Sequence, residues 1–269
     1  MQQPYLEGFR LSVEQKRFWN LEEQGSNLTS QLVLLVNGCL EIEKLTLSLR
    51  SVVAQNEALR LSFEYLPGMK TPVQILNDFE PLELKRLDAK NRPKDLAIES
   101  TLQEEREAFN LSKGLASVLI SFSENEHALL ITIPAISADT RSLINIAQRL
   151  SNFYLGIDSE TEEIGFIQFA EWQNELLSSE DAAEGKSYWQ KMHQQEFGRV
   201  FLPLEKKQNT HTAFNFSSES RQIGCYHTMK ETVAEINSSV ENFLVAAFQL
   251  LLARLSEESN FVLAYRTEG

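Results

Sequence analysis

Short apolar runs with strand character alternate along this chain with longer segments of helical period. A buried-strand pattern at Gln31–Val36 precedes a helical stripe over 41–55, and the runs 59–65 and 72–76 flank the turn-forming pair Pro67-Gly68. The alternation continues with a helix at 93–109, strands at 116–123 and 127–133, and a helix at 142–154. Mixed strands and helices of these lengths predict an α/β fold.

The pattern changes in the last part of the chain. Residues 166–192 have helical period, whereas 198–220 lose periodicity and are rich in Asn, Thr, Ser and Lys, which predicts a loop. We expect a strand at 221–229, an apolar helix at 240–255 and another strand at 261–265. Because the chain stops just after that strand, we expect it to be an excised fragment.

The charge balance argues against several classes of partner. Lys and Arg total 25 against 38 Asp and Glu, a net charge of -13, whereas nucleic acid and anionic membrane surfaces require a basic protein surface. The longest apolar runs, such as Phe243–Leu252, are far shorter than the roughly 20 residues that span a bilayer, and the N-terminus has no signal-peptide pattern. We therefore expect a cytoplasmic protein without a nucleic-acid or membrane partner.

The cysteines predict no cross-link and no metal site. Cys39 and Cys225 are far apart in the sequence and form neither a CxxC pair nor a Cys/His ligand spacing. We interpret them as two buried free thiols and expect no directly bound cofactor or metal.

Two segments of the first quarter of the chain resemble motifs of the condensation domains of nonribosomal peptide synthetases. Residues 9–19 resemble the opening motif, with matches at Ser12, Gln15, Arg17 and Trp19. Ser12 and Gln15 also have the spacing of a capping box that begins a helix. Residues 57–63 resemble the second motif, Arg-His-Glu-x-Leu-Arg-Thr-x-Phe, although Gln55 and Asn56 replace its leading Arg-His.

Later segments continue the resemblance in the family's order. Residues 166–172 look like the fourth motif, Tyr-x-Asp-Phe-Ala-x-Trp, with Phe166 and Gln168 as departures, and Tyr188-Trp189 matches the pair that usually follows it. Residues 246–255 and 261–269 are similar to the helix and strand that open the family's C-terminal lobe.

The resemblance implies the fold of chloramphenicol acetyltransferase, an α/β two-layer sandwich whose two lobes meet at a tunnel for carrier-bound substrates. We expect residues 1–178 to form the N-terminal lobe, 179–220 a helix and interlobe loop, and 221–269 the truncated start of the C-terminal lobe. The aromatic residues are interpreted as core or lobe-packing groups rather than a cofactor site: Trp19, Phe63, Phe169, Trp172 and Trp189.

The active-site motif of the family is degenerate in this chain. The motif His-His-x-x-x-Asp-Gly falls on residues 134–140, where Pro134 and Ala135 replace both histidines and Thr140 replaces the glycine. In the family the second histidine positions or deprotonates the acceptor amine that attacks a thioester, and Ala135 has no atom able to do so. Because β-branched Thr140 is poorly suited to positive φ, we also expect the loop to have changed shape.

One residue of this motif is retained, and the resemblance gives it a structural role. Asp139 is expected to hold the loop through an arginine, with Arg60 and Arg141 as the candidates. His127 is a poor replacement for the lost imidazole, because at about 3.3 Å per residue its strand places it roughly 26 Å from the motif. Other candidates have simpler interpretations: His193 and His211 as solvated groups, Cys225 with His227 as packing on one strand face, Ser137 as a helix N-cap, and Ser142 outside any nucleophile elbow.

Three functions follow from these observations. The lost histidine favours a noncatalytic condensation-like module that serves as a structural or docking platform for an adjacent adenylation domain. The alternative is an acyl or peptidyl transferase that joins carrier-bound thioester substrates through an amide and relies on Asp139, a water molecule or positioning alone. The third is a binding module that receives the phosphopantetheine arm of a carrier domain, although acidic carriers would be repelled by the net negative charge.

Overall fold

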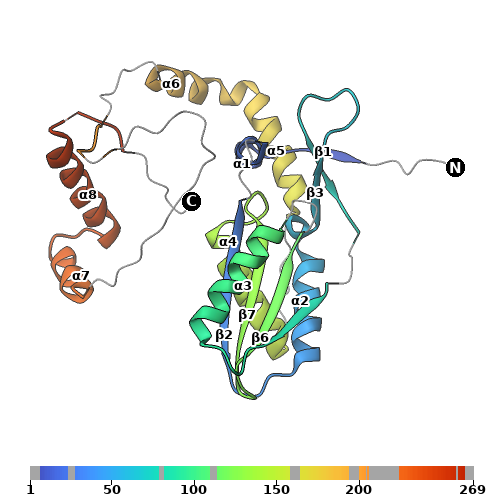
Figure 1. Ribbon diagram of the computed structural model, residues 1–269. Coiled ribbons are helices and arrows are strands. Elements are labelled where there is room, and N and C mark those ends of the chain that lie inside the picture. The colour runs from blue at the N-terminus through green and yellow to red at the C-terminus, as the bar shows by residue number, and fades with distance from the viewer. Residues whose placement is uncertain are drawn as a thin grey trace. The chain divides into compact units, whose positions relative to one another are not determined.

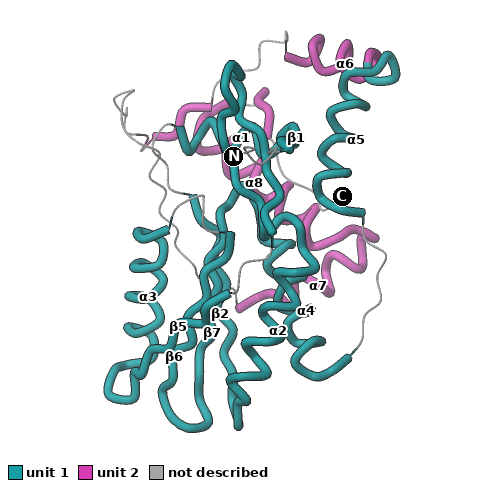
Figure 2. The backbone as a smooth tube through the Cα atoms, turned by 90° about the vertical axis from the view of Figure 1, so that its right-hand side faces the viewer, with its two compact units in different colours: residues 1–182 teal, residues 183–269 magenta. Residues whose placement is uncertain are grey.

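The structure is a computed structural model that describes residues 7–23, 28–78, 82–109, 114–157, 164–193, 200–203, 205, 224–258 and 260–263. The chain forms two compact units, residues 1–182 and residues 183–269 (Figure 2). Every strand found among the described residues lies in the first unit.

A four-stranded sheet forms the centre of the first unit (Figure 1). Its strand order is β2 (Thr29–Asn37), β7 (Glu126–Pro134), β6 (Ala116–Ser121) and β5 (Leu84–Asp88). The β5–β6 pair is parallel and the other two pairs are antiparallel. A parallel pair requires a long crossover, which helix α3 (Lys94–Ala108) supplies.

Helices cover both faces of this sheet. Helices α2 (Ile42–Gln55) and α4 (Thr140–Leu155) pack on one face through a core that includes Leu49, Ile131 and Ile146. These two layers form the predicted α/β sandwich, and α3 lies against the opposite face, as Figure 2 shows. Because both faces are covered, all of β7 after Glu126 is buried.

A smaller sheet lies beside this sandwich in the first unit. It consists of β1 (Gly8–Arg10), β4 (Val73–Leu76) and β3 (Leu61–Glu64), all antiparallel. The predicted β3–β4 hairpin is confirmed, with Gly68 of its turn at φ 84°. The remaining elements of the unit are α1 (Val13–Glu23), η1 (Glu57–Arg60), α5 (Phe166–Ser178) and η2 (Glu180–Ala182).

The second unit contains helices α6 (Ala183–His193), α7 (Tyr226–Glu235) and α8 (Val240–Ser256). The prediction of α8 is confirmed. Its apolar side chains are exposed: Phe243, Leu244, Phe248, Leu250, Leu251 and Leu255. Among the described residues no single helix is long and apolar enough to cross a membrane, although α7 and α8 pass that test together as a pair bent by 100°.

The strand predicted at 221–229 is wrong where the structure describes it, because Tyr226 begins helix α7. The described part of the second unit has no strand for this segment to pair with, and its backbone groups are satisfied locally instead, as by Met229 N donating to Cys225 O at 3.0 Å. Residues 261–263 are not in a strand, and 264–265 lie outside the described residues. Most of the predicted loop at 198–220 also lies outside them.

Candidate functional site

The degenerate motif forms a tight turn between β7 and α4. Ala135 N donates to Leu28 O at 2.9 Å, and Ser137 N donates to Pro134 O at 2.9 Å. Ser30 Oγ donates to Ala138 O at 2.6 Å. The turn is therefore held by contacts to main-chain atoms, and the side chain at position 135, a methyl group, makes none of them.

Asp139, not Ser137, is the N-cap of α4. The Asp139 carboxylate accepts hydrogen bonds from Ser142 N and Ser142 Oγ, both at 2.9 Å. The prediction of Ser137 as the cap is wrong because the helix begins at Thr140, too far along for the Ser137 hydroxyl to reach its first amides. The Ser137 Oγ is buried and has no hydrogen-bond partner among the described residues.

The position that holds glycine in the family motif does not adopt a positive φ in this chain. Thr140 is the first residue of α4 and is not among the described residues with positive φ. A β-branched side chain is therefore compatible with the turn as built.

The predicted arginine partners of Asp139 lie on two different elements. Arg60 ends η1, and its Nη1 donates to Asn77 O at 3.1 Å. Arg141 lies in the first turn of α4, next to the cap. An ion pair that holds the loop remains a prediction for both arginines.

His127 lies at the other end of its strand from the degenerate motif. His127 is buried near the start of β7, the end of the strand remote from Ala135, with Nδ1 3.0 Å from Ser121 Oγ and Nε2 3.3 Å from Glu124 O. His193 is exposed at the end of α6, and His211 lies outside the described residues. The position of His127 agrees with its interpretation as a poor replacement for the lost imidazole, and the exposure of His193 agrees with its interpretation as a solvated group.

Two predictions for the cysteines are wrong. Cys225 and His227 do not share a strand face, because Cys225 is the N-cap of α7 and residues two apart on a helix point about 200° apart. His227 lies 3.4 Å from Glu231 instead. Cys39 and Cys225 are both exposed rather than buried. In the described part of the chain, no group of His, Cys, Asp and Glu is arranged to hold a metal ion.

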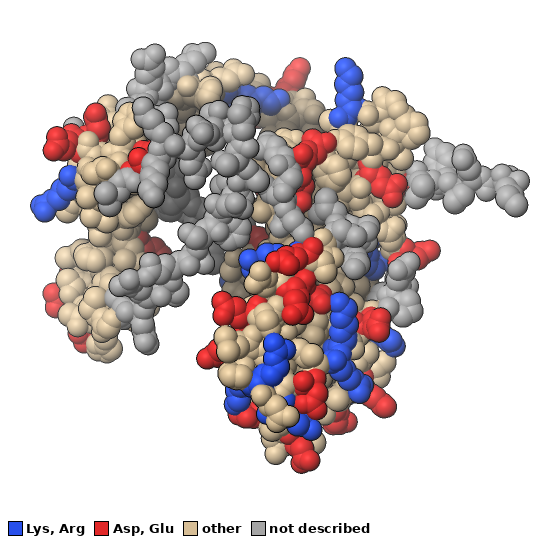
Figure 3. Space-filling model, viewed as in Figure 1, with Lys and Arg blue, Asp and Glu red and all other residues tan. Residues whose placement is uncertain are grey.

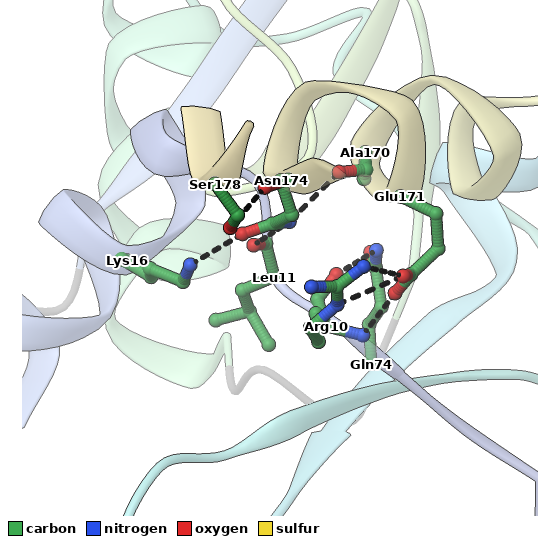
Figure 4. A network of polar contacts seen from close by, with 8 residues as sticks. All are labelled: Arg10, Leu11, Lys16, Gln74, Ala170, Glu171, Asn174 and Ser178. Carbon is green, nitrogen blue, oxygen red and sulfur yellow. Dashed lines mark hydrogen bonds and ion pairs between the residues drawn. The ribbon is translucent and has the colours of Figure 1, made fainter. Parts of the chain in front are cut away.

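The first and fourth motifs meet in one polar network (Figure 4). Glu171 of α5 accepts from Arg10 N at 2.7 Å and from Arg10 Nε at 2.8 Å, and Arg10 Nη2 pairs with the same carboxylate. The side-chain hydrogen bond and the charge of Arg10 lower the pKa of Glu171, and the same hydrogen bond and the charge of Glu171 raise the pKa of Arg10. A fork of this kind fixes the orientation of α5 against β1.

Asn174 is the buried centre of the same network. Its Nδ2 donates to Leu11 O at 2.9 Å and to Ala170 O at 2.7 Å, while its Oδ1 accepts from Lys16 Nζ at 2.7 Å. Asn174 therefore joins α5 to α1 and to the segment between β1 and α1 (Figure 4). The predicted capping box is confirmed, since Ser12 N donates to Gln15 Oε1 and Gln15 N to Ser12 Oγ.

The second motif supports the start of α5. Glu57 Oε2 accepts from Ile167 N at 3.1 Å, so this carboxylate caps a helix that follows it by more than a hundred residues. A Cβ added at Gly165, the N-cap position of α5, would lie 2.6 Å from both Glu57 oxygens. A glycine there lets Glu57 approach the helix end.

The aromatic residues predicted to be core or lobe-packing groups divide into two sets. Phe63 is 9% exposed, and Trp19 packs against it with ring centroids 6.2 Å apart. In contrast, Phe169, Trp172 and Trp189 are 41%, 54% and 69% exposed. Phe169 and Trp172 are not core groups of the first unit, because a different face of α5, which carries Ile167, Ala170 and Asn174, is the buried one. Lobe packing stays a prediction for them.

Charges on the α3 side of the first unit are mixed. Acidic and basic side chains are interspersed there (Figure 3), with ion pairs between Lys85 and Glu105 at 2.7 Å and between Lys94 and Glu126 at 2.6 Å.

Comparisons with known proteins extend this description. The family described as "Condensation domain" matches residues 7–269. The chain is 26% identical over 268 residues to surfactin synthase subunit 2 of Bacillus subtilis (strain 168), covering 97% of this chain and 7% of that protein. The chain thus spans less than a tenth of the length of this relative.

Two solved structures share the fold. The condensation domain from Monacolin K polyketide synthase MokA aligns with a TM-score of 0.75 and 19% identity, covering 94% of this chain and 61% of that one. The complex of the X-domain and OxyB from teicoplanin biosynthesis contains a chain that aligns with a TM-score of 0.72 and 23% identity, covering 95% of this chain and 58% of that one.

Proposed function

The chain belongs to the condensation-domain family, and on that premise we propose that it is a noncatalytic condensation-like module of a nonribosomal peptide synthetase. In this role it serves as a structural or docking platform beside an adenylation domain, in the cytoplasm. Residues 1–178 act as its N-terminal lobe, 179–220 as the connection and 221–269 as the start of its C-terminal lobe.

One observation carries this proposal: the position of the catalytic histidine is occupied by Ala135. General base catalysis needs a proton acceptor within hydrogen-bond reach of the acceptor amine. A methyl group cannot accept a proton, and the buried His127 is hydrogen-bonded at the other end of β7. Asp139 Oδ1 is engaged in capping α4.

A docking role has precedent among proteins of this fold. One of the similar structures is a complex of the X-domain with a second protein, OxyB. A condensation-type fold can therefore form a complex with another protein.

The alternative is an acyl or peptidyl transferase that works without a histidine. Asp139 is retained, and positioning of two reactants can remove several kcal/mol from a barrier with no acid or base, about 7–11 kcal/mol in the most favourable intramolecular cases. Carrier domains would then deliver both substrates on phosphopantetheine arms. A receptor that binds a loaded arm without reacting it is the third possibility.

A single-turnover condensation assay tests the proposal. The protein, in the polypeptide in which it occurs naturally, is mixed with loaded donor and acceptor carriers, and native protein is compared with Ala135→His and Asp139→Ala. We expect no amide product from the native protein. Binding of a neighbouring adenylation domain, measured by calorimetry, should be unchanged in Ala135→His.

Product from the native protein that is lost in Asp139→Ala would overturn the platform proposal and identify a histidine-independent transferase. Circular dichroism of Asp139→Ala must accompany this result, because loss of the helix cap alone costs about 1 kcal/mol of stability. Retention of a loaded carrier without product would favour the receptor function.

A further inference from the structure

Helix α5 is apolar on two opposite sides. One side is buried and carries Ile167 and Ala170. Phe169, Trp172 and Leu176 lie on the other side, with 41%, 54% and 40% of each residue exposed. Their spacing of three and four residues places them in one line along the helix, here named the α5 aromatic stripe.

The stripe is pre-organised for binding. The rings of Phe169 and Trp172 are in contact, with centroids 5.9 Å apart and planes tilted by 38°, and Phe166 extends the row at 6.4 Å from Phe169. Asn174, Glu57 and Glu171 fix the helix that carries them. Aromatic side chains held in this way lose little conformational freedom on binding and are enriched at the centres of protein interfaces.

The charges that α5 and the turn after it carry have one sign. Residues 164–182 contain no Lys or Arg and four acidic residues: Glu171, Glu175, Glu180 and Asp181. Arg10 neutralises Glu171, whereas Glu175, Glu180 and Asp181 are exposed. On the α3 side, by comparison, Glu105 and Glu126 are paired with lysines.

Aromatic faces beside carboxylates suit a basic partner. A Lys or Arg side chain of the partner can lie over the Trp172 ring and pair with Glu175 at the same time. Aliphatic side chains of the partner can pack against Phe169 and Leu176. An acidic carrier domain would be repelled by the same carboxylates.

We propose that the α5 aromatic stripe docks a basic amphipathic helix of a neighbouring protein domain, one that presents leucine-like side chains flanked by Lys or Arg. This inference rests on the platform function proposed above and names the surface and the partner chemistry for it. The apolar side chains of an amphipathic helix are spaced three and four residues apart, so they can pack side by side along a straight stripe on another helix.

Binding of a defined probe tests the inference. The probe is a fluorescent amphipathic helical peptide with Leu on one face and Lys on the other, titrated against the whole chain by anisotropy. We expect Trp172→Ala and Leu176→Ala each to weaken binding, the former by at least about tenfold. Glu175→Lys should weaken it several-fold and reduce its dependence on salt.

Matched controls separate the stripe from general attraction to an acidic protein. Glu99→Lys on α3 changes the net charge by the same amount as Glu175→Lys, and Leu47→Ala removes a side chain of α2 that is 61% exposed. Both should leave the affinity unchanged. A peptide with Glu in place of Lys should not bind.

Several results would overturn the inference. Equal losses in Glu175→Lys and Glu99→Lys would mean that net charge alone attracts the peptide. Unchanged affinity in both Trp172→Ala and Leu176→Ala, with native circular dichroism, would mean that the peptide binds elsewhere. Neither result affects the condensation assay, whose outcome depends on Ala135, so the two proposals fail separately.

Discussion

Replacing Asn174 with alanine should loosen the attachment of α5 to the N-terminal segment. The change removes both hydrogen bonds that Nδ2 donates. The carbonyl oxygen of Leu11, a residue that is 1% exposed, is left without this partner. The carbonyl of Ala170 keeps its backbone partner within the helix. A buried carbonyl left unsatisfied costs about 1–3 kcal/mol, and with the small cavity we expect a total loss of about 2–3 kcal/mol.

Urea unfolding measures this loss. With a slope of about 2 kcal/mol per M, the transition midpoint should fall by about 1 M. Tryptophan fluorescence and far-UV circular dichroism should be followed together, because two compact units need not unfold in one transition.

Gln173→Ala is the matched control on the same helix. Gln173 Oε1 accepts from Val13 N at 3.0 Å at an exposed site, where water can replace it, so the loss should stay below about 1 kcal/mol. If Asn174→Ala lowers the free energy of unfolding no more than Gln173→Ala does, burial does not make the Asn174 hydrogen bonds contribute more than exposed ones, and the reasoning is refuted.

Three further predictions concern the other contacts of the first unit. Asp139→Ala should lower the free energy of unfolding by about 1 kcal/mol through loss of the α4 cap, and Asp139→Asn should restore most of it in the same urea assay. Arg10 lowers the pKa of Glu171, so the pair stabilises the fold at pH values above the ordinary glutamate pKa of about 4.3. This contribution is lost as the pH falls through the lower pKa that Glu171 has in the folded protein. Glu171→Gln should therefore reduce the dependence of stability on pH in the acidic range. Gly165→Ala should destabilise by about 1 kcal/mol by displacing the Glu57 carboxylate, whereas Gly185→Ala, where an added Cβ meets nothing within 4 Å, should not, as thermal melts can show.

Local pattern was sufficient for most of the first unit. Apolar periodicity predicted α2, α3 and the β6–β7 pair, and the Pro67-Gly68 turn predicted the β3–β4 hairpin, because each depends on residues close in sequence. The same reasoning failed at Tyr226, where Tyr and Thr favour a strand by propensity but no strand of the described residues pairs with them. Strand formation depends on such neighbours more than helix formation does.

The site was predictable only in part. The residue at the catalytic position could be identified from the motif, since Ala135 follows a strand and precedes a helix as expected. The links from Arg10 to Glu171 and from Glu57 to Ile167 could not, because each joins residues more than a hundred positions apart and neither pair has a local signature. The exposure of Phe169 and Trp172 in the first unit could not be predicted, because helical period alone does not say which apolar face is covered.

The contacts that hold the turn after β7 are independent of the side chain that the chemistry of the family requires there. Leu28 O holds Ala135 through the main chain and the Asp139 carboxylate holds the helix, so neither contact depends on the side chain at position 135. Selection for a stable domain therefore places no demand on a histidine at this position. A lineage in which the reaction was no longer required could lose the imidazole by drift and still inherit an intact scaffold.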